Sequence, residues 1–398
     1  MDNPNSDRST ELSLRLLSFA YFAMGTGSLA VIGTLPSIAA SLDLGRGAVA
    51  LLVTAFSVTF AIAAPLLQIL YGDRPRRTLI LVGLGLMAVG AIGSALAPNY
   101  SVLLAARIVA GLGAAAVGPV ASALGSSLVP PAAQGHALAV VFSGMTIASV
   151  AGVPLAAWLG ATVGWRPMFA LVGIGTAVLA QLVARTVHDR SGGRRVRPAD
   201  LFEALRHPAT GFGVAVMVLE MAGMFATYTM IAPMLADRFG AGPAAVSAAL
   251  SVIGIAGVLG NVVARRIARV WPADRAIVVS LVGLAVVFGL LAVIPRIYLV
   301  AVALLVFWAL ASDVFMPSQQ RRMVELAPEM RGLLLALNSS AIYVGMSLGS
   351  FAAGTLHPLY GLGVLPLASV GFFVLALGAL ALSRRAAMRP SVVVEAEG

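Results

Sequence analysis

The sequence predicts an all-α membrane protein with twelve transmembrane helices, arranged as two six-helix lobes. Three observations predict this class: twelve apolar stretches of about 20 residues, a composition of 60% hydrophobic and 11% charged residues, and arginines concentrated in every second gap. An apolar run of about 20 residues with almost no charge is long enough to cross a bilayer as a helix. Soluble domains carry about 25% charged residues, so this chain lacks the composition of an ordinary wet surface.

The apolar runs are continuous rather than alternating, which indicates helices and not the strands of a membrane barrel. In order, the stretches are 14–36, 48–71, 78–97, 100–123, 135–160, 167–186, 210–234, 245–268, 275–294, 297–318, 331–356 and 363–384. The lipid bilayer is therefore the first partner that the sequence predicts, and a bacterial inner (plasma) membrane is the predicted location.

Arginine placement predicts the orientation of the spans. Of the 26 basic residues, 21 lie on the side of the N-terminus and one, Arg107, lies within a span. The four on the opposite side are Arg46, Arg166, Arg238 and Arg296. By the positive-inside rule, both termini are predicted to be cytoplasmic. Because the arginines are divided among many short loops, and lysine is absent, the net charge of +10 does not predict nucleic-acid binding.

The longest polar interruption divides the chain near its middle. It covers 187–207, and its Gly, Pro and Arg content indicates a cytoplasmic linker with a short surface helix at 199–206. The predicted organisation is an N-terminal lobe at 1–186, this linker, a C-terminal lobe at 208–386 and a cytoplasmic tail at 387–398.

A ridge of small residues recurs in both halves. In the fifth span it comprises Gly144, Ala148, Gly152, Ala156 and Gly160, and in the eleventh Ala341, Gly345, Gly349 and Ala353. A spacing of four places each set on one helix face, where small residues let membrane helices pack closely. Gly and Ala are abundant enough for such ridges to arise by chance, but two in corresponding spans favour duplication in the same orientation.

Three ionisable residues, Arg107, Glu220 and Asp313, lie within the predicted spans. Each costs roughly 2.5–3.5 kcal/mol at a helix centre on insertion scales, so each is a functional candidate. For Arg107 the functional interpretation is an anion-holding group, or one that tunes the proton affinity of a neighbouring acid. The structural interpretation is an arginine bonded to backbone carbonyls.

Glu220 lies near the middle of the seventh span, and Met224 and Tyr228 share its helix face. The functional interpretation is a carboxyl that loads and releases a proton within a pocket lined by Met and aromatic side chains. The structural interpretation is a neutral acid that is hydrogen-bonded to a neighbouring helix.

Asp313 and Asn338 are further pocket candidates in the second half. Asp313 either belongs to a proton or cation path, or pairs at the membrane interface with Arg321 or Arg322. Asn338 either lines the pocket or joins helices by hydrogen bonds, as asparagines in spans often do.

Several other classes of site are not predicted. The chain has no cysteine, its four histidines show no ligand spacing, and no phosphate-binding GxxxxGK[ST] loop occurs. We expect no metal and no cofactor. Since no nucleophile–base set appears either, we do not expect an enzyme.

Several runs, in order along nearly the whole chain, resemble the major facilitator superfamily. They are Leu35 to Ala39, Asp73 to Arg77 (Asp-Arg-Pro-Arg-Arg), Ala106 to Ala115, Gly144 to Pro154, Gly164 to Phe169 and Ala226 to Pro233. The nearest resemblance is to the drug:proton antiporter branch, with its arabinose-efflux-like and chloramphenicol-exporter-like members.

The resemblance implies roles for two of these runs. Asp73, with Arg74, Arg76 and Arg77, would form a cytoplasmic latch between the lobes. Gly144, Gly152 and Pro154 would form the antiporter-like packing motif, in which Pro154 bends the fifth span. Relatives of this type often carry an acid in the first span, but residues 21–28 contain none, which leaves Glu220 and Asp313 as the proton sites.

The resulting hypothesis is a secondary active transporter that exports small apolar or amphipathic, drug-like solutes in exchange for protons by alternating access. We expect a functional monomer. A sugar or metabolite exporter, or an uptake symporter, on the same fold is the alternative. A non-transporting membrane sensor or scaffold is a more distant one.

Overall fold

The computed structural model describes residues 4–130, 133–187, 195 and 197–388. Within these residues, twelve helices are long and apolar enough to cross a membrane, which confirms the predicted fold class. The predicted tail beyond residue 388 and most of the central linker, 188–194 and 196, lie outside the described residues.

The first six spans are built from seven helices. They are α1 (Pro4–Ser41), α2 (Arg46–Tyr71), α3 (Arg76–Leu96), α4 (Tyr100–Ser127), α5 (Gln134–Ile147), α6 (Val153–Thr162) and α7 (Trp165–Thr186). A π-helical segment, Ala148–Gly152, joins α5 to α6, so these three pieces form one span. Pro154 follows this segment and lacks the backbone donor that a regular helix needs there.

The linker helix α8 (Pro198–Arg206) confirms the surface helix predicted at 199–206. The second six spans then follow. They comprise α9 (Pro208–Tyr228), α11 (Pro243–Val270), α12 (Ala273–Val293), α13 (Tyr298–Leu326), α14 (Arg331–Tyr360) and α15 (Val364–Ala387), with the short α10 (Ile231–Pro233) after α9.

Two spans end elsewhere than hydropathy predicts. The seventh was predicted to reach residue 234, but α9 ends at Tyr228 and is followed by α10 and a π-helical segment, Met234–Arg238. The tenth was predicted to end at residue 318, but α13 continues to Leu326. Its polar extension is helical because Gln, Arg, Met, Glu and Leu all favour helix.

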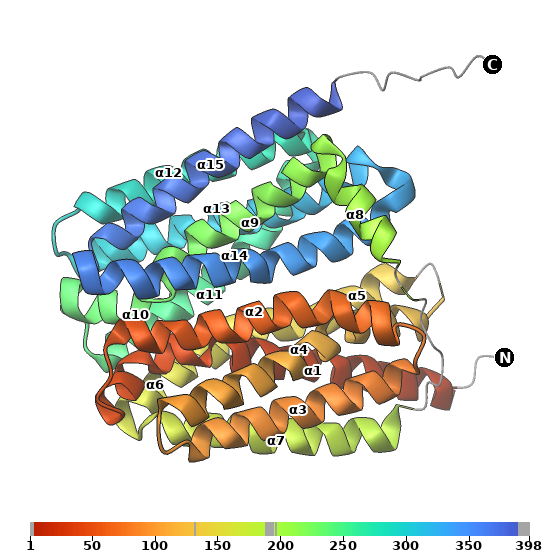
Figure 1. The fold of residues 1–398 in the computed structure, drawn as a ribbon, viewed down its shortest axis with the longest axis horizontal. Coiled ribbons are helices and arrows are strands. Elements are labelled where there is room, and N and C mark those ends of the chain that lie inside the picture. Colours follow the sequence, from red (N-terminus) through yellow and green to blue (C-terminus); the bar gives the residue numbers. More distant parts are fainter. Residues whose placement is uncertain (1–3, 131–132, 188–194, 196, 389–398) are drawn as a thin grey trace.

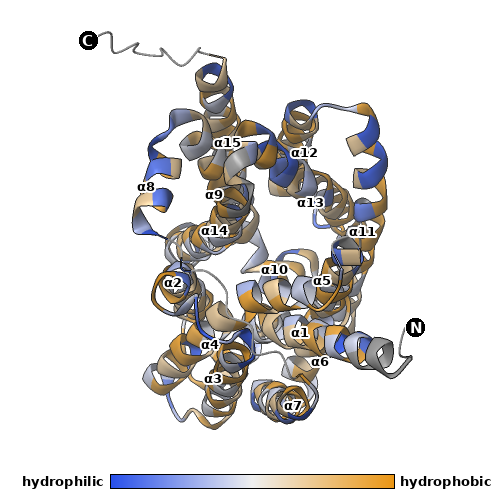
Figure 2. Cartoon of the chain, turned by 90° about the vertical axis from the view of Figure 1, so that its right-hand side faces the viewer, coloured by the Kyte–Doolittle hydropathy of each residue, from blue (hydrophilic) through white to orange (hydrophobic). Residues whose placement is uncertain are grey.

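The spans form two lobes, one from α1–α7 and one from α9–α15 (Figures 1 and 2). Between the lobes, α2 packs against α14, and α11 packs against the fifth span. Each contact thus joins the second span of one lobe to the fifth span of the other. This equivalence agrees with a repeat of six spans in the same orientation.

Each small-residue ridge packs against the first helix of its own lobe. A Cβ added to Gly144 would meet the Ser18 carbonyl of α1, and one added to Gly345 would meet the Val218 carbonyl of α9. Backbone atoms cannot move aside as a flexible side chain can, so glycine is required for this separation.

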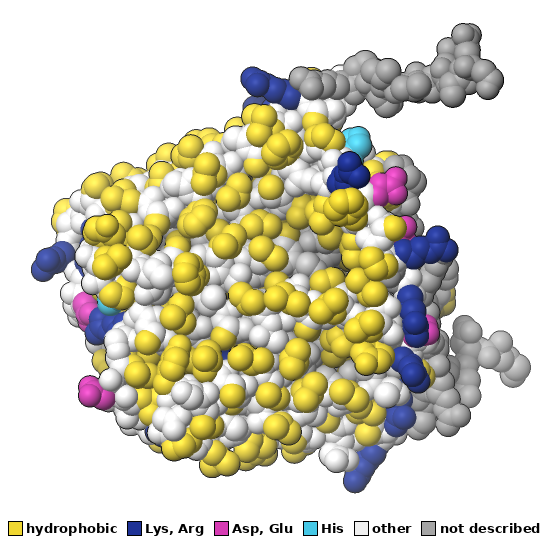
Figure 3. Space-filling view, viewed as in Figure 1, with side chains coloured by type: hydrophobic (Ala, Val, Ile, Leu, Met, Phe, Trp, Pro, Cys, Tyr) yellow, Lys and Arg dark blue, Asp and Glu magenta, His cyan; other side chains and the backbone are white. Residues whose placement is uncertain are grey.

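The two ends of the bundle differ in charge. We call the end where α1 begins and α15 finishes the terminal end, and the opposite one the far end. In the view of Figure 3, basic side chains lie mostly along the right-hand edge, which is the terminal end in Figure 1. The orientation of these ends relative to the membrane stays a prediction.

Several close contacts between the lobes lie in the far half of the bundle. Near the start of α2, a Cβ added to Gly47 would lie 2.5 Å from the Gly354 carbonyl oxygen of α14. Further along the same pair, the Thr54 and Ser350 hydroxyls are hydrogen-bonded at 2.8 Å. On the other side, the Ser247 hydroxyl of α11 donates to the Pro154 carbonyl at 2.9 Å.

Candidate functional site

Glu220 is the most deeply buried acid of the second lobe. Its side chain is 0% exposed, and neither carboxyl oxygen has a hydrogen-bond partner among the described residues. The hydrogen bond to a neighbouring helix that the structural interpretation predicts is therefore absent among these residues. Burying a carboxylate without a donor or a cation is costly, so this position suits a carboxyl that gains and loses a proton.

Met224 and Tyr228, one and two turns further along α9, meet Trp308 of α13. The Trp308 indole Nε1 donates to the Met224 sulfur at 2.5 Å, and the Ser312 hydroxyl donates to the same sulfur at 3.1 Å. The Tyr228 and Trp308 rings meet edge to face, with centroids 5.2 Å apart. The structure thus brings two of the sequence candidates together with two residues that sequence reasoning missed.

Further aromatic rings extend this cluster. Phe225 packs against Tyr228, while Phe288 of α12 packs against both Trp308 and Phe373 of α15. Edge-to-face pairs of this kind hold rings in defined orientations. Trp308 lies in the middle of a span, whereas tryptophans of membrane proteins are enriched in the aromatic belts at the interfaces. This position was the feature of the sequence that could have identified Trp308 as a site residue.

Asp313 lies on the side of α13 that faces α11. Its carboxylate accepts a hydrogen bond from the Asn261 amide at 3.4 Å, and Gly257 and Gly260 leave room for it on α11. It is close enough to Glu220 for the two carboxyl charges to interact.

The proposed pairing of Asp313 with Arg321 or Arg322 is wrong. Arg321 pairs with Glu325 at 2.6 Å, one turn along its own helix, and Arg322 pairs with Asp274 of α12 at 2.5 Å. Because α13 continues two turns beyond its predicted end, both arginines point to neighbours nearer the terminal end. No salt bridge among the described residues includes Asp313.

Asn338 is separated from the Met224–Tyr228 pair. It is 0% exposed, and neither its amide nitrogen nor its oxygen has a partner among the described residues. Since Gly345 packs at Val218 and α9 and α14 run in the same direction, Asn338 lies about two turns nearer the terminal end than that contact. It therefore faces the first part of α9 rather than Glu220.

Arg107 is buried inside the first lobe. Its guanidinium donates to the carbonyls of Gly27 at 2.6 Å and Ser28 at 3.1 Å, both in α1. The cation also lies 4.6 Å from the ring centre of Phe56 and 5.8 Å from that of Phe169, a cation–π arrangement. These contacts are those of the structural interpretation, and the anion-holding role stays a prediction.

The predicted latch loop contacts the linker. Asp73 pairs with Arg195 at 2.9 Å, and the hydrogen bond from Arg195 lowers the pKa of the exposed Asp73 carboxyl. Arg77 donates to the Ala184 carbonyl at the end of α7 at 2.5 Å. The described contacts of these two residues are thus with the linker and the first lobe, and a latch to the second lobe stays a prediction for Asp73, Arg74, Arg76 and Arg77.

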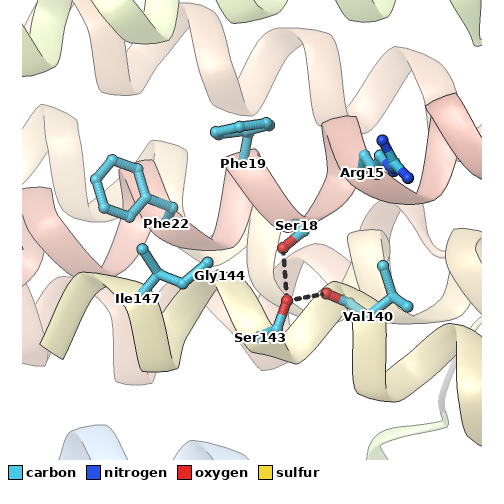
Figure 4. Close-up of a pocket in the computed structure, with 8 residues that line it drawn as sticks. All are labelled: Arg15, Ser18, Phe19, Phe22, Val140, Ser143, Gly144 and Ile147. Atoms are coloured by element: carbon cyan, nitrogen blue, oxygen red, sulfur yellow. Dashed lines mark hydrogen bonds between the residues drawn. The ribbon is translucent and has the colours of Figure 1, made fainter. Parts of the chain in front are cut away.

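A separate apolar groove runs between α1 and α5 (Figure 4), with a volume of about 270 Å³. Its aromatic part comprises Phe19 and Phe22, and Arg15 lies toward one end. On its floor, the Ser18 and Ser143 hydroxyls are hydrogen-bonded at 3.0 Å. The groove belongs to the first lobe and does not include the acids of the second.

Comparison with known proteins agrees with this architecture. A family model described as Major Facilitator Superfamily matches residues 17–350 and also 213–396. The inner membrane transport protein YdhP of Escherichia coli (strain K12) is 31% identical over 385 residues, covering 96% of this chain and 97% of that protein. A chloramphenicol resistance protein of Streptomyces lividans is 34% identical over 270 residues, covering 66% of this chain and 68% of its own.

Solved structures also match. The crystal structure of a D-xylose–proton symporter superposes with a TM-score of 0.74 at 18% identity, covering 93% of this chain and 97% of the other. At that identity the match shows the fold alone. With twelve apolar spans and an inner-membrane relative, the chain is a multi-pass protein of a bacterial inner membrane.

Proposed function

The chain belongs to the Major Facilitator Superfamily, and on that basis we propose that it exports small apolar or amphipathic solutes in exchange for protons. The observation that carries the proposal is the position of Glu220. Its carboxyl is buried, has no hydrogen-bond partner in the part of the chain that the structure describes, and lies one turn from the Met224–Tyr228–Trp308 cluster. An acid and an adaptable apolar surface side by side allow protonation and solute binding to influence each other.

The chemistry of the cluster supports an apolar or amphipathic solute. Methionine adapts to irregular shapes, and the partly exposed Met224 and Tyr228 present a thioether and a phenol to the lobe interior. The Streptomyces relative is named for chloramphenicol resistance, which supports a drug-like solute. A sugar presents several hydroxyl groups, each of which needs a hydrogen-bond partner when it is buried, so the alternative of a sugar transporter has less support from these residues.

Transport by alternating access requires two facing states. We place the terminal end in the cytoplasm by the arginine bias, so the close contacts of the far half seal the opposite side. Protonation of Glu220 either competes with the solute or favours one facing state. It shifts the equilibrium only by the difference in proton affinity between the two states. Arg107 contributes by holding the middle of α1 in place.

The direct test is transport by the purified protein in lipid vesicles with an imposed pH gradient. Chloramphenicol and a small panel of lipophilic compounds serve as solutes, with D-xylose as the sugar comparison. Uptake of a lipophilic solute that follows the gradient supports the proposal. Gradient-driven uptake of the sugar alone supports the alternative, and no uptake of any solute by a folded protein supports the sensor or scaffold.

Asp237→Asn is expected to loosen the far end of the bundle. Arg46, at the start of α2, pairs with Asp237 of the other lobe, and both are partly exposed. Such a pair contributes up to about 1 kcal/mol, which is about a fivefold change in the closed population. Because the chain has no cysteine, Ser350→Cys supplies a single thiol at the lobe interface. Its labelling by an impermeant reagent should become up to about fivefold faster.

The charge swap Arg46→Asp with Asp237→Arg should restore slow labelling. Arg296→Ala is the matched control, since this exposed far-end arginine is in no salt bridge among the described residues. Equal labelling rates for Asp237→Asn and Arg296→Ala would refute a role for the pair in closing the far end.

A further inference from the structure

Four buried side chains of α9, α13 and α14 hold polar atoms that lack a partner among the described residues. They are both oxygens of Glu220, both amide atoms of Asn338, the Gln319 oxygen and one terminal nitrogen of Arg322. All four side chains are at most 4% exposed. Buried polar atoms are nearly always paired with protein or with ordered water, and an unpaired one costs about 1–3 kcal/mol.

Two of these side chains meet α9 at Gly213. The Gln319 amide nitrogen donates to the Gly213 carbonyl at 2.7 Å, which fixes the direction of its free oxygen. A Cβ added to Gly213 would lie 3.4 Å from the unpartnered nitrogen of Arg322. The glycine therefore permits both polar groups of α13 to approach the backbone of α9.

Asn338 belongs to the same level of the lobe. The ridge on α14 places Gly345 at Val218, and the two helices run in the same direction, so Asn338 lies opposite residues 211–214. Three helices thus contribute to one polar cluster around Gly213: α9 through its backbone, α13 through Gln319 and Arg322, and α14 through Asn338.

This cluster reaches the surface at the terminal end. Arg322 donates from Nε to Asp274 at 2.5 Å, and Asp274, with its side chain one-third exposed, also pairs with Arg384 at 3.1 Å. The Asp274 carboxylate is shared between the two arginines, so it partly offsets the positive charge of Arg322 beside the cluster.

At its inner end the cluster approaches Glu220. Seven residues separate Gly213 from Glu220, which is about 10 Å along an α-helix. Hydrogen-bonded oxygens are about 2.8 Å apart, so two or three water molecules would be enough to span that distance. Asp313, from the neighbouring face of α13, is the other charged group near Glu220.

We propose that Gln319, Asn338 and Arg322 hold a chain of water molecules that carries protons between the terminal surface and Glu220. This inference rests on the proposed role of Glu220 as the coupling acid. In each passage the Glu220 carboxylate gains one proton from the adjacent water molecule. That water molecule regains a proton from its neighbour, and the last water molecule of the chain takes one proton from solvent. Release reverses the steps, and no other reactant is consumed. Gln319 and Asn338 act as positioning residues.

The test compares Gln319→Leu with Gln319→Glu in reconstituted vesicles. Leucine removes the oxygen that faces the chain, whereas glutamate keeps one. Ser318→Ala is the control, because the Ser318 hydroxyl donates to the Val314 carbonyl of its own helix. We expect Gln319→Leu to slow pH-driven transport by about a hundredfold, the lower end of the range that a positioned proton-transfer group contributes. Solute exchange at equal pH, which needs no net proton movement, should be unchanged, and Gln319→Glu should retain pH-driven transport.

Infrared difference spectra provide the second readout. Hydrogen–deuterium exchange of the Glu220 carboxyl, assigned by its loss in Glu220→Gln, should be slower in Gln319→Leu. Asn338→Leu gives a second variant if Gln319→Leu fails to fold. Normal exchange and transport in both leucine variants, with Glu220→Gln uncoupled, would overturn the water chain but leave Glu220 as the coupling acid. Full coupling in Glu220→Gln would overturn both.

Discussion

Replacing Glu220 by Gln is expected to abolish solute accumulation driven by a pH gradient. Glutamine has nearly the same shape but cannot ionise, so the neighbouring Met224–Trp308 contact is kept while proton binding is lost. For one proton exchanged per solute, a gradient of one pH unit is worth about 1.4 kcal/mol and supports about tenfold accumulation. In Glu220→Gln vesicles that accumulation should fall to the level found without a gradient.

The control for this substitution is Glu325→Gln, which removes an exposed acid that pairs with Arg321, one turn away. It should accumulate solute as the unmodified protein does. Exchange of solute at equal pH should persist in Glu220→Gln, which shows that its binding cluster is intact. Full accumulation by Glu220→Gln would sink the assignment of this residue and transfer attention to Asp313.

Gly144→Val is expected to destabilise the first lobe more than any other single change considered for it. The new side chain would meet the Ser18 carbonyl of α1, and a backbone atom cannot turn away. The helices would have to separate along a ridge that also includes Gly152, which faces Thr26. Overpacking of this kind costs about 1–3 kcal/mol and occasionally more. The measurement is the thermal unfolding temperature in detergent, together with the yield of folded protein.

A matched substitution separates this effect from the general cost of valine in a helix. Gly175→Val on α7 adds the same atoms where nothing lies within 4 Å of the new Cβ. It should unfold close to the temperature of the unmodified protein. Gly345→Val, which meets the Val218 carbonyl in the second lobe, should behave like Gly144→Val. If Gly144→Val were as stable as Gly175→Val, close packing of α1 on the fifth span would not limit stability.

The site was only partly readable from the chain. Glu220, Met224 and Tyr228 share a helix face by spacing alone, and the structure keeps them on one side of α9. Trp308 and Ser312 were missed because the sequence of α13 does not predict that this helix packs against α9 at Met224. The two lie 84 and 88 residues from their partner in the sequence.

Arginines give the clearest contrast. The excess of arginines on one side of the spans, 21 against 4, can be counted from the sequence because it depends only on which loop each arginine occupies. For Arg107 the sequence left two interpretations open, and the structure shows its guanidinium bonded to two backbone carbonyls of α1. Arg322 was assigned to the interface, but it is 4% exposed and bonded to Asp274, since α13 extends past its hydrophobic limit.

By itself the sequence determined the class of the protein, the number and approximate limits of its spans, the linker helix and the two small-residue ridges. These depend on transfer of local segments from water to lipid and on helical spacing, which are properties of residues adjacent in the chain. Only the tertiary structure decided which lobe helices meet, that Asp313 faces Asn261, and that buried polar atoms lack a partner among the described residues in Glu220, Gln319, Arg322 and Asn338. Those outcomes depend on distances between helices far apart in the sequence, where each polar atom is satisfied or left unpaired by its neighbours.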